Sequence, residues 1–115
     1  MAKGQNVVVL TGDVGNVVHT STYVKNDPVI TFMLCVEEKE NYPVWIKVSA
    51  YGNQAQYLKK LSLDKGDNLS FLGKLVNKTS SRGDREFVEI EVKLLDQVIL
   101  RKRHNRDQNL EQEAD

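Results

Sequence analysis

Three residues on one predicted strand have the types and spacing needed to hold flat rings and phosphates. The segment 42–51 alternates in character, which predicts a β-strand whose two faces differ. Trp45, Lys47 and Tyr51 share the face opposite the aliphatic side chains. Aromatic rings stack on any base, at about 1–3 kcal/mol per base, and a nearby cation neutralises a backbone phosphate. The pattern therefore predicts a surface that binds single-stranded nucleic acid.

The two rings of this strand also have a structural interpretation. Exposed aromatic side chains pack under loops or in subunit interfaces, so Trp45 and Tyr51 taken alone leave both interpretations open. For Tyr57, on the segment that follows, packing of a helix against the sheet is the interpretation that the residues favour.

Basic residues in neighbouring segments are further candidates for phosphate contacts. A solvated lysine is the default on any protein surface, so only grouping around the two aromatic rings supports a binding role. The candidates are Lys25, Lys59, Lys60, Lys74, Lys78, Arg82 and Arg85. The basic run 101–106 either adds electrostatic attraction or pairs with the acidic run 107–115.

The sequence predicts a protein without catalytic residues, metal or cofactor. His19 and His104 are the only histidines, they lie in different predicted loops, and neither belongs to a nucleophile constellation. The single Cys35 cannot form an internal disulfide or build a thiolate metal site alone. Glu89 and Glu91 follow no calcium-loop pattern, and we interpret them as solvated charge.

The elements that must position these residues are three strands, one helix and two further strands. The strands are predicted at 6–14, 29–36, 42–51, 69–76 and 87–95, and the helix at 53–63. This order lacks alternating βα units and excludes a doubly wound parallel sheet. It favours an all-β fold with one short helix: a five-stranded antiparallel Greek-key barrel with the helix between strands 3 and 4, the layout of the OB-fold.

Three details of this barrel are also predicted. The glycines of the segment 12–15 indicate a bend or bulge in a curved strand. The polar segment 77–84 is predicted to be a loop. In the last strand, alternation places four aliphatic residues inward and three charged residues outward; the inward set is Val88, Ile90, Val92 and Leu94, and the outward set is Glu89, Glu91 and Lys93.

Length and composition fit one small domain. The chain has 115 residues, 40% of them hydrophobic, and its 16 basic residues balance 16 acidic ones, so net charge gives no support for polyanion binding. We expect an OB-fold nucleic-acid-binding domain over residues 1–100 and a polar, flexible tail over 101–115. The chain begins without the apolar region of a secretory signal, and no apolar run is long enough to cross a bilayer, which favours an intracellular protein without a membrane partner.

In the order and spacing of its motifs, the chain over about residues 5–99 resembles the bacterial-type single-stranded DNA-binding proteins of bacteria, organelles and some phages. The matching motifs are Asn6-Val-Val-Val-Leu-Thr-Gly12, Ile30-Thr-Phe-Met-Leu34, Trp45-Ile-Lys-Val48, Tyr51-Gly52, Tyr57-Leu-Lys-Lys60, Lys65-Gly66 and Leu72-Gly-Lys-Leu75.

The resemblance implies a non-catalytic protein that binds single-stranded DNA with little sequence preference, in DNA replication, recombination or repair. By position, Trp45 and Tyr51 match base-stacking residues, Lys47 matches a phosphate contact, and Tyr57, Lys59 and Lys60 match contacts on the helix side. It also implies a homo-oligomer, a tetramer or a dimer, located in the cytoplasm with the nucleoid or in an organelle or phage equivalent. Replication or repair proteins are possible partners, although the family's acidic tail with an aromatic tip is not seen here.

The chain departs from the family pattern in the loop between strands 2 and 3. An aromatic residue is usual there, whereas this chain has Glu37, Glu38 and Glu40. With fewer stacking platforms we expect weaker binding. Three alternatives stay open: a divergent accessory or replication-restart OB-fold protein that works through protein contacts, a paralogue that has lost DNA binding and serves as an assembly module, and a binder of single-stranded RNA.

Overall fold

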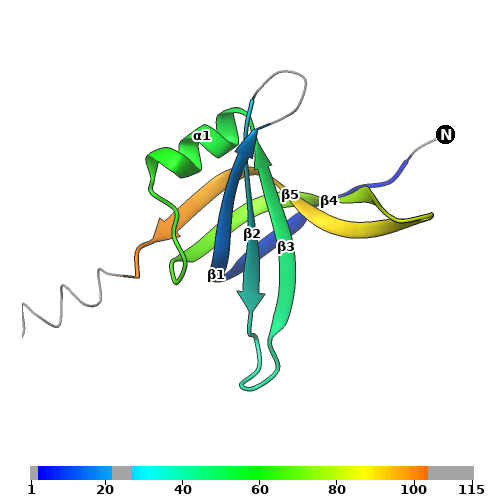
Figure 1. Ribbon diagram of the computed structural model, residues 1–115. Coiled ribbons are helices and arrows are strands. Elements are labelled where there is room, and N and C mark those ends of the chain that lie inside the picture. The colour runs from blue at the N-terminus through cyan, green and yellow to red at the C-terminus, as the bar shows by residue number, and fades with distance from the viewer. Residues whose placement is uncertain (1–2, 22–26, 104–115) are drawn as a thin grey trace, which may run out of the picture.

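The computed structural model describes residues 3–21 and 27–103, except for the side chains of Ser80 and Arg82, and shows a closed five-stranded barrel (Figure 1). The elements are β1 (Val8–Ser21), β2 (Pro28–Val36), β3 (Val44–Tyr51), α1 (Asn53–Lys60), β4 (Asn68–Arg82) and β5 (Arg85–Arg101). Neighbours around the barrel follow the order β1-β2-β3-β5-β4. All pairs are antiparallel except β3 and β5, which pair in parallel at Val48↔Val92 and Ser49↔Lys93. The predicted OB-fold, with its helix between β3 and β4, is confirmed.

The barrel closes because β1 pairs with different strands along its length. Its first half pairs with β4 and its second half with β2, and Asp13 belongs to both ladders. A Cβ atom at Gly12 would collide with the carbonyl oxygen of Cys35, so only glycine permits this approach of β1 to β2. The β1–β2 register shifts between Val14 and Val17, which confirms the predicted bulge.

The core lies inside the barrel and under α1. Fully buried side chains such as Phe32, Phe71 and Leu94 come from three different strands and pack together. Helix α1 adds Ala55 and Leu58, three residues apart and both inaccessible to solvent. Burying a side chain the size of leucine contributes about 1.5–3 kcal/mol, which fixes α1 against the barrel. The helix ends at Lys60, before the predicted end at Leu63.

The predicted loop at 77–84 is wrong. β4 and β5 continue as a paired ribbon beyond the barrel, out to the pair Arg82↔Arg85, as the projecting hairpin in Figure 1 shows. Gly83 adopts a φ of 63° at the tip, a backbone conformation that suits glycine. Backbone pairing between two long strands thus overrides the polar composition of this segment.

The inward assignment of Val88 and Ile90 is also wrong. These side chains are 66% and 68% exposed, because they lie on the projecting hairpin where no core faces them. Val92 and Leu94, further along β5 and within the barrel, are buried as predicted.

A buried carboxylate holds the end of β5 to the turn that follows α1. Asp67 is 2% exposed and accepts hydrogen bonds from Lys102 Nζ at 2.8 Å, the backbone N–H of Asp64 at 2.9 Å and that of Arg103 at 3.1 Å. Lys102 also donates to the carbonyl oxygen of Ser62. Burial raises the pKa of Asp67, but these hydrogen bonds and the charge of Lys102 outweigh it, so the pKa lies below its ordinary value of 3.8.

Residues 101–103 therefore belong to the barrel or are bonded to it. The remainder of the predicted tail, 104–115, and the candidate Lys25 lie outside the described residues. Within the described ranges, no helix is long and apolar enough to cross a membrane.

Candidate nucleic-acid interface

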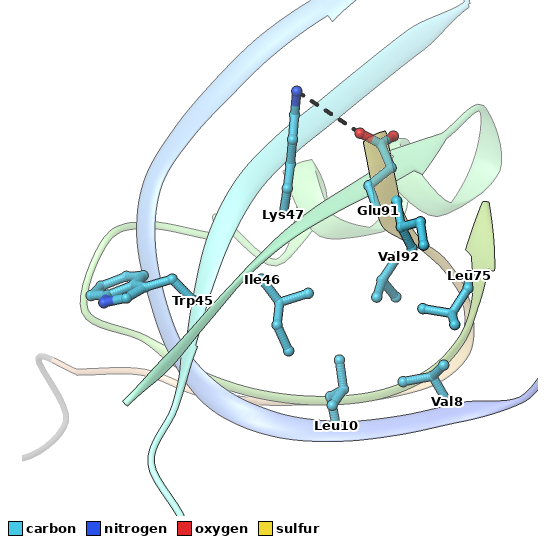
Figure 2. A pocket seen from close by; sticks show the side chains of 9 residues that line it. Val8, Leu10, Trp45, Ile46, Lys47, Leu75, Glu91 and Val92 are labelled. Carbon is cyan, nitrogen blue, oxygen red and sulfur yellow. Dashed lines mark ion pairs between the residues drawn. The ribbon is translucent and has the colours of Figure 1, made fainter. Parts of the chain in front are cut away.

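Trp45 presents the most accessible ring on the outer face of β3. It is 57% exposed and stands opposite Cys35 in the β2–β3 register. A Cβ atom placed on Gly15 of β1 would lie 3.4 Å from Cζ3 of Trp45, so the ring extends across β2 toward β1. In Figure 2 the ring points away from the aliphatic side chains on the inner side of the barrel. This leaves an aromatic platform with one accessible side.

An apolar groove of about 390 Å³ lies on the same outer face, next to this platform. Lys47, two residues after Trp45 on the same face, lies at one side of the groove. Met33 is the partner of Lys47 in the β2–β3 register. The groove is lined by Asn16, Val18, Thr31, Phe32, Met33 and Lys47. An apolar surface beside an exposed ring and an ammonium group suits a base and its phosphate.

Glu91 lies buried where β3 and β5 meet. Its side chain is 2% exposed, which corrects the prediction of a solvated glutamate. Oε2 lies 3.8 Å from Lys47 Nζ, Oε1 lies 3.7 Å from Lys78 Nζ, and Oε1 accepts a hydrogen bond from the Ser49 hydroxyl at 3.1 Å. Figure 2 shows Lys47 reaching toward this carboxylate. Alternation along β5 places Glu91 on the outer face, but the lysines and Ser49 cover it there.

Tyr51 differs from Trp45 because a cation already covers its ring. Lys93 Nζ lies 5.5 Å from the ring centroid, within range of a cation–π interaction, and Tyr51 is half-buried. Lys93 is opposite Lys74 in the β4–β5 register. Lys93 was not among the predicted contacts; its outward orientation was readable from alternation, but its place beside β3 was not.

A search of curated proteins found no match to the sequence. A model of the single-strand binding protein family matches residues 5–98, most of the chain. The chain belongs to the single-strand binding protein family. The resemblance seen in the sequence motifs is thus confirmed, and as a member of this family the protein binds single-stranded DNA and is not an enzyme.

A structural comparison agrees with the fold of this family. The chain is similar to a Plasmodium falciparum SSB in complex with ssDNA, with a TM-score of 0.69 and 21% sequence identity. The match covers 88% of this chain and 96% of that chain.

The barrel of this single-strand binding protein brings several of the predicted contacts onto one surface. The outer face of β3, β5 and β4 carries Trp45, Lys47, Tyr51, Lys74 and Lys78. We call this surface the β3–β5–β4 face. It also carries Lys93, and two of its four lysines, Lys47 and Lys78, form ion pairs with the buried carboxylate of Glu91.

Other predicted contacts lie outside the β3–β5–β4 face, on α1 and on the hairpin. Tyr57, Lys59 and Lys60 are exposed on α1, where the 46% exposure of Tyr57 shows that its ring is not the one that packs the helix to the barrel. Arg85 is exposed near the hairpin tip. Arg82 pairs with it through the backbone, and its side chain is outside the described part of the structure.

A second pocket, of about 270 Å³, opens where β3 and β5 separate (Figure 2). Its walls are mainly aliphatic, with the side chains of Lys47 and Glu91 at one side. The lining residues are Val8, Leu10, Trp45, Ile46, Lys47, Leu75, Ile90, Glu91 and Val92. Among the described residues, no group of histidine, cysteine or acidic side chains is arranged to hold a metal ion.

Proposed function

We propose that this protein holds single-stranded DNA along the β3–β5–β4 face, with one base stacked on Trp45 and the adjoining phosphate at Lys47. The exposed ring next to the apolar groove is the observation that carries this proposal. Stacking uses the flat face that every base has, so we expect little sequence preference. The function served is DNA replication, recombination or repair.

The remaining candidates extend the same path. Trp45 and Tyr51 are six residues apart on β3, about 20 Å at the ordinary strand rise, so a strand of DNA passing both runs parallel to β3. Lys74 and Lys78 offer phosphate contacts on one side of this path. Tyr57, Lys59, Lys60, Arg82 and Arg85 are proposed as outer contacts on the helix and the hairpin.

We also propose that the protein acts as a homo-oligomer, a tetramer or a dimer. Large apolar side chains are exposed at the start of β1, where Val9 is 72% exposed, and on the hairpin, where Val88 and Ile90 are exposed. Monomers rarely leave such side chains grouped in water, and a second copy would cover them. The location with the nucleoid, or in an organelle or phage equivalent, stays a prediction.

Trp45 is the only tryptophan, so its fluorescence reports the proposed site directly. We expect oligo-dT to quench it strongly, with an affinity that falls as salt rises, because phosphate contacts release counterions. Absence of both quenching and binding at low salt would contradict the proposal and favour the accessory role through protein contacts. Oligo-U, titrated in the same way, tests the alternative of an RNA ligand.

The mechanism is tested by Trp45→Ala, measured by anisotropy of a labelled oligo-dT. Loss of one stacking platform, worth about 1–3 kcal/mol, weakens binding by about 5- to 150-fold. Trp45→Phe is the matched control, since it keeps a ring on the same strand and retains most of the affinity. Equal affinity of Trp45→Ala and the wild type would exclude stacking on this ring.

A further inference from the structure

Glu91 places a negative charge in the middle of the surface proposed to receive DNA phosphates. The carboxylate is 2% exposed, and its neighbours Lys47 and Lys78 are two of the proposed phosphate contacts. Burial of an unpaired carboxylate is costly, so the two ammonium groups and the Ser49 hydroxyl are what make this position tolerable.

The lysines are held loosely, whereas the carboxylate is held in place. The Nζ-to-oxygen distances of 3.8 Å and 3.7 Å exceed the 2.7–2.9 Å of a charge-assisted hydrogen bond. The side chains of Lys47 and Lys78 are 43% and 47% exposed, so both ammonium groups can turn toward another anion. Ser49, by contrast, is fully buried, and its hydroxyl also lies 3.3 Å from that of Thr31.

We propose that Glu91 is an internal counterion for Lys47 and Lys78, which DNA phosphates must displace or share in order to bind. This inference rests on the proposed DNA path over the β3–β5–β4 face. In the free protein the carboxylate occupies the position of a phosphate, so each lysine is already partly neutralised. Glu91 thereby lowers the affinity for single strands and reduces the dependence of binding on salt.

Glu91→Gln tests this proposal, because it keeps the size of the side chain and its hydrogen bond with Ser49 while removing the charge. We expect oligo-dT to bind about three- to tenfold more tightly at low salt. The slope of log K against log salt concentration should steepen by about 0.7 for each lysine released, so the gain shrinks as salt rises.

Glu86→Gln is the matched control for net charge. Glu86 lies on the same strand, is exposed near the hairpin tip and pairs with Ser81 through the backbone. If removal of any negative charge were enough, the two variants would bind equally, and the proposal would be overturned. Weaker binding by a folded Glu91→Gln would also overturn it, since Glu91 would then be positioning the lysines for DNA.

A double-mutant cycle with Lys78→Met tests whether Glu91 affects DNA binding through Lys78. In the wild-type background Lys78 is shielded, so its removal should change the salt slope by clearly less than 0.7; in the Glu91→Gln background the change should approach 0.7. Equal changes in both backgrounds would show that Glu91 does not compete for this lysine.

Two measurements distinguish failure of this inference from failure of the proposed function and from failure of the variant to fold. Wild-type protein that does not bind oligo-dT contradicts the proposed function itself, whereas wild-type binding with no difference between Glu91→Gln and Glu86→Gln contradicts only the inference. If urea unfolding shows that Glu91→Gln does not fold, Glu91→Asp draws the carboxylate back by one methylene; about twofold tighter binding supports the proposal, and unchanged binding overturns it.

Discussion

Asp67 and Glu91 are equally buried carboxylates whose partners differ. Each is 2% exposed, and each is paired with lysine. Asp67 accepts three hydrogen bonds at 2.8–3.1 Å, two of them from backbone N–H groups. Glu91 accepts one from Ser49 at 3.1 Å and has two lysines at 3.7 Å and 3.8 Å.

This difference separates a structural contact from one available to a ligand. The partners of Asp67 belong to the backbone or to Lys102, whose side chain is only 21% exposed, so they are committed to holding β5 and the turn after α1 together. The partners of Glu91 are half-exposed lysines on the proposed DNA surface. Burial alone therefore does not show whether a charge stabilises the fold or tunes binding; the geometry of its partners does.

The largest expected effect on stability is that of Asp67→Ala. Three donors lose their acceptor, which should lower the free energy of unfolding by about 2–3 kcal/mol. Urea unfolding measures this loss, and oligo-dT affinity should stay within twofold of the wild type under conditions where the variant is folded. A loss below about 0.5 kcal/mol would remove the distinction drawn between the two carboxylates.

The lowered pKa of Asp67 predicts how stability depends on pH. The folded state releases this proton at a lower pH than the unfolded chain does, so the unfolded state binds more protons between the two pKa values. The contribution is full above the ordinary value of 3.8 and is lost as the pH falls below it toward the folded-state pKa. Urea midpoints measured through this range should fall less steeply for Asp67→Asn than for the wild type; parallel curves would contradict the assignment.

The sequence predicted the barrel well because alternation and turn residues report local structure. It failed on the hairpin for a physical reason: Val88 and Ile90 alternate like core residues, yet the strands that carry them leave the barrel. Whether an aliphatic face has a core opposite it depends on strand length and closure, which are properties of the whole sheet.

The positions of the candidate residues were predicted to a similar extent, and their role in binding stays a prediction. Trp45 and Lys47 could be found because one strand carries both on one face. Glu91 and Lys93 reach that surface only through the parallel pairing of β3 with β5, between segments more than forty residues apart. No local pattern in the sequence reports such a pairing, so the buried carboxylate was interpreted as a solvated one.

Replacing one lysine partner of Asp67 and one of Glu91 sharpens the comparison between the two carboxylates. Lys102→Met should lower the free energy of unfolding by about 1–2 kcal/mol, since it removes a close charged hydrogen bond, and leave oligo-dT affinity unchanged. Lys47→Met should do the reverse: a change in stability below about 1 kcal/mol and binding about two- to threefold weaker. The two variants, compared by urea unfolding and by anisotropy, would break the comparison if both affected the same property.

The smallest expected effect is that of Lys74→Ala, measured against Lys65→Ala. Lys74 is half-buried on β4, opposite Lys93 on the β3–β5–β4 face, whereas Lys65 is exposed in the turn that contains Asp67. Both variants remove one positive charge, so any difference between them reflects position. Lys74→Ala should weaken oligo-dT binding about twofold and reduce the salt slope by up to about 0.7, while Lys65→Ala should leave the slope unchanged. Equal slopes would mean that phosphates do not pass Lys74, and the DNA path would then have to be confined to β3 and its groove.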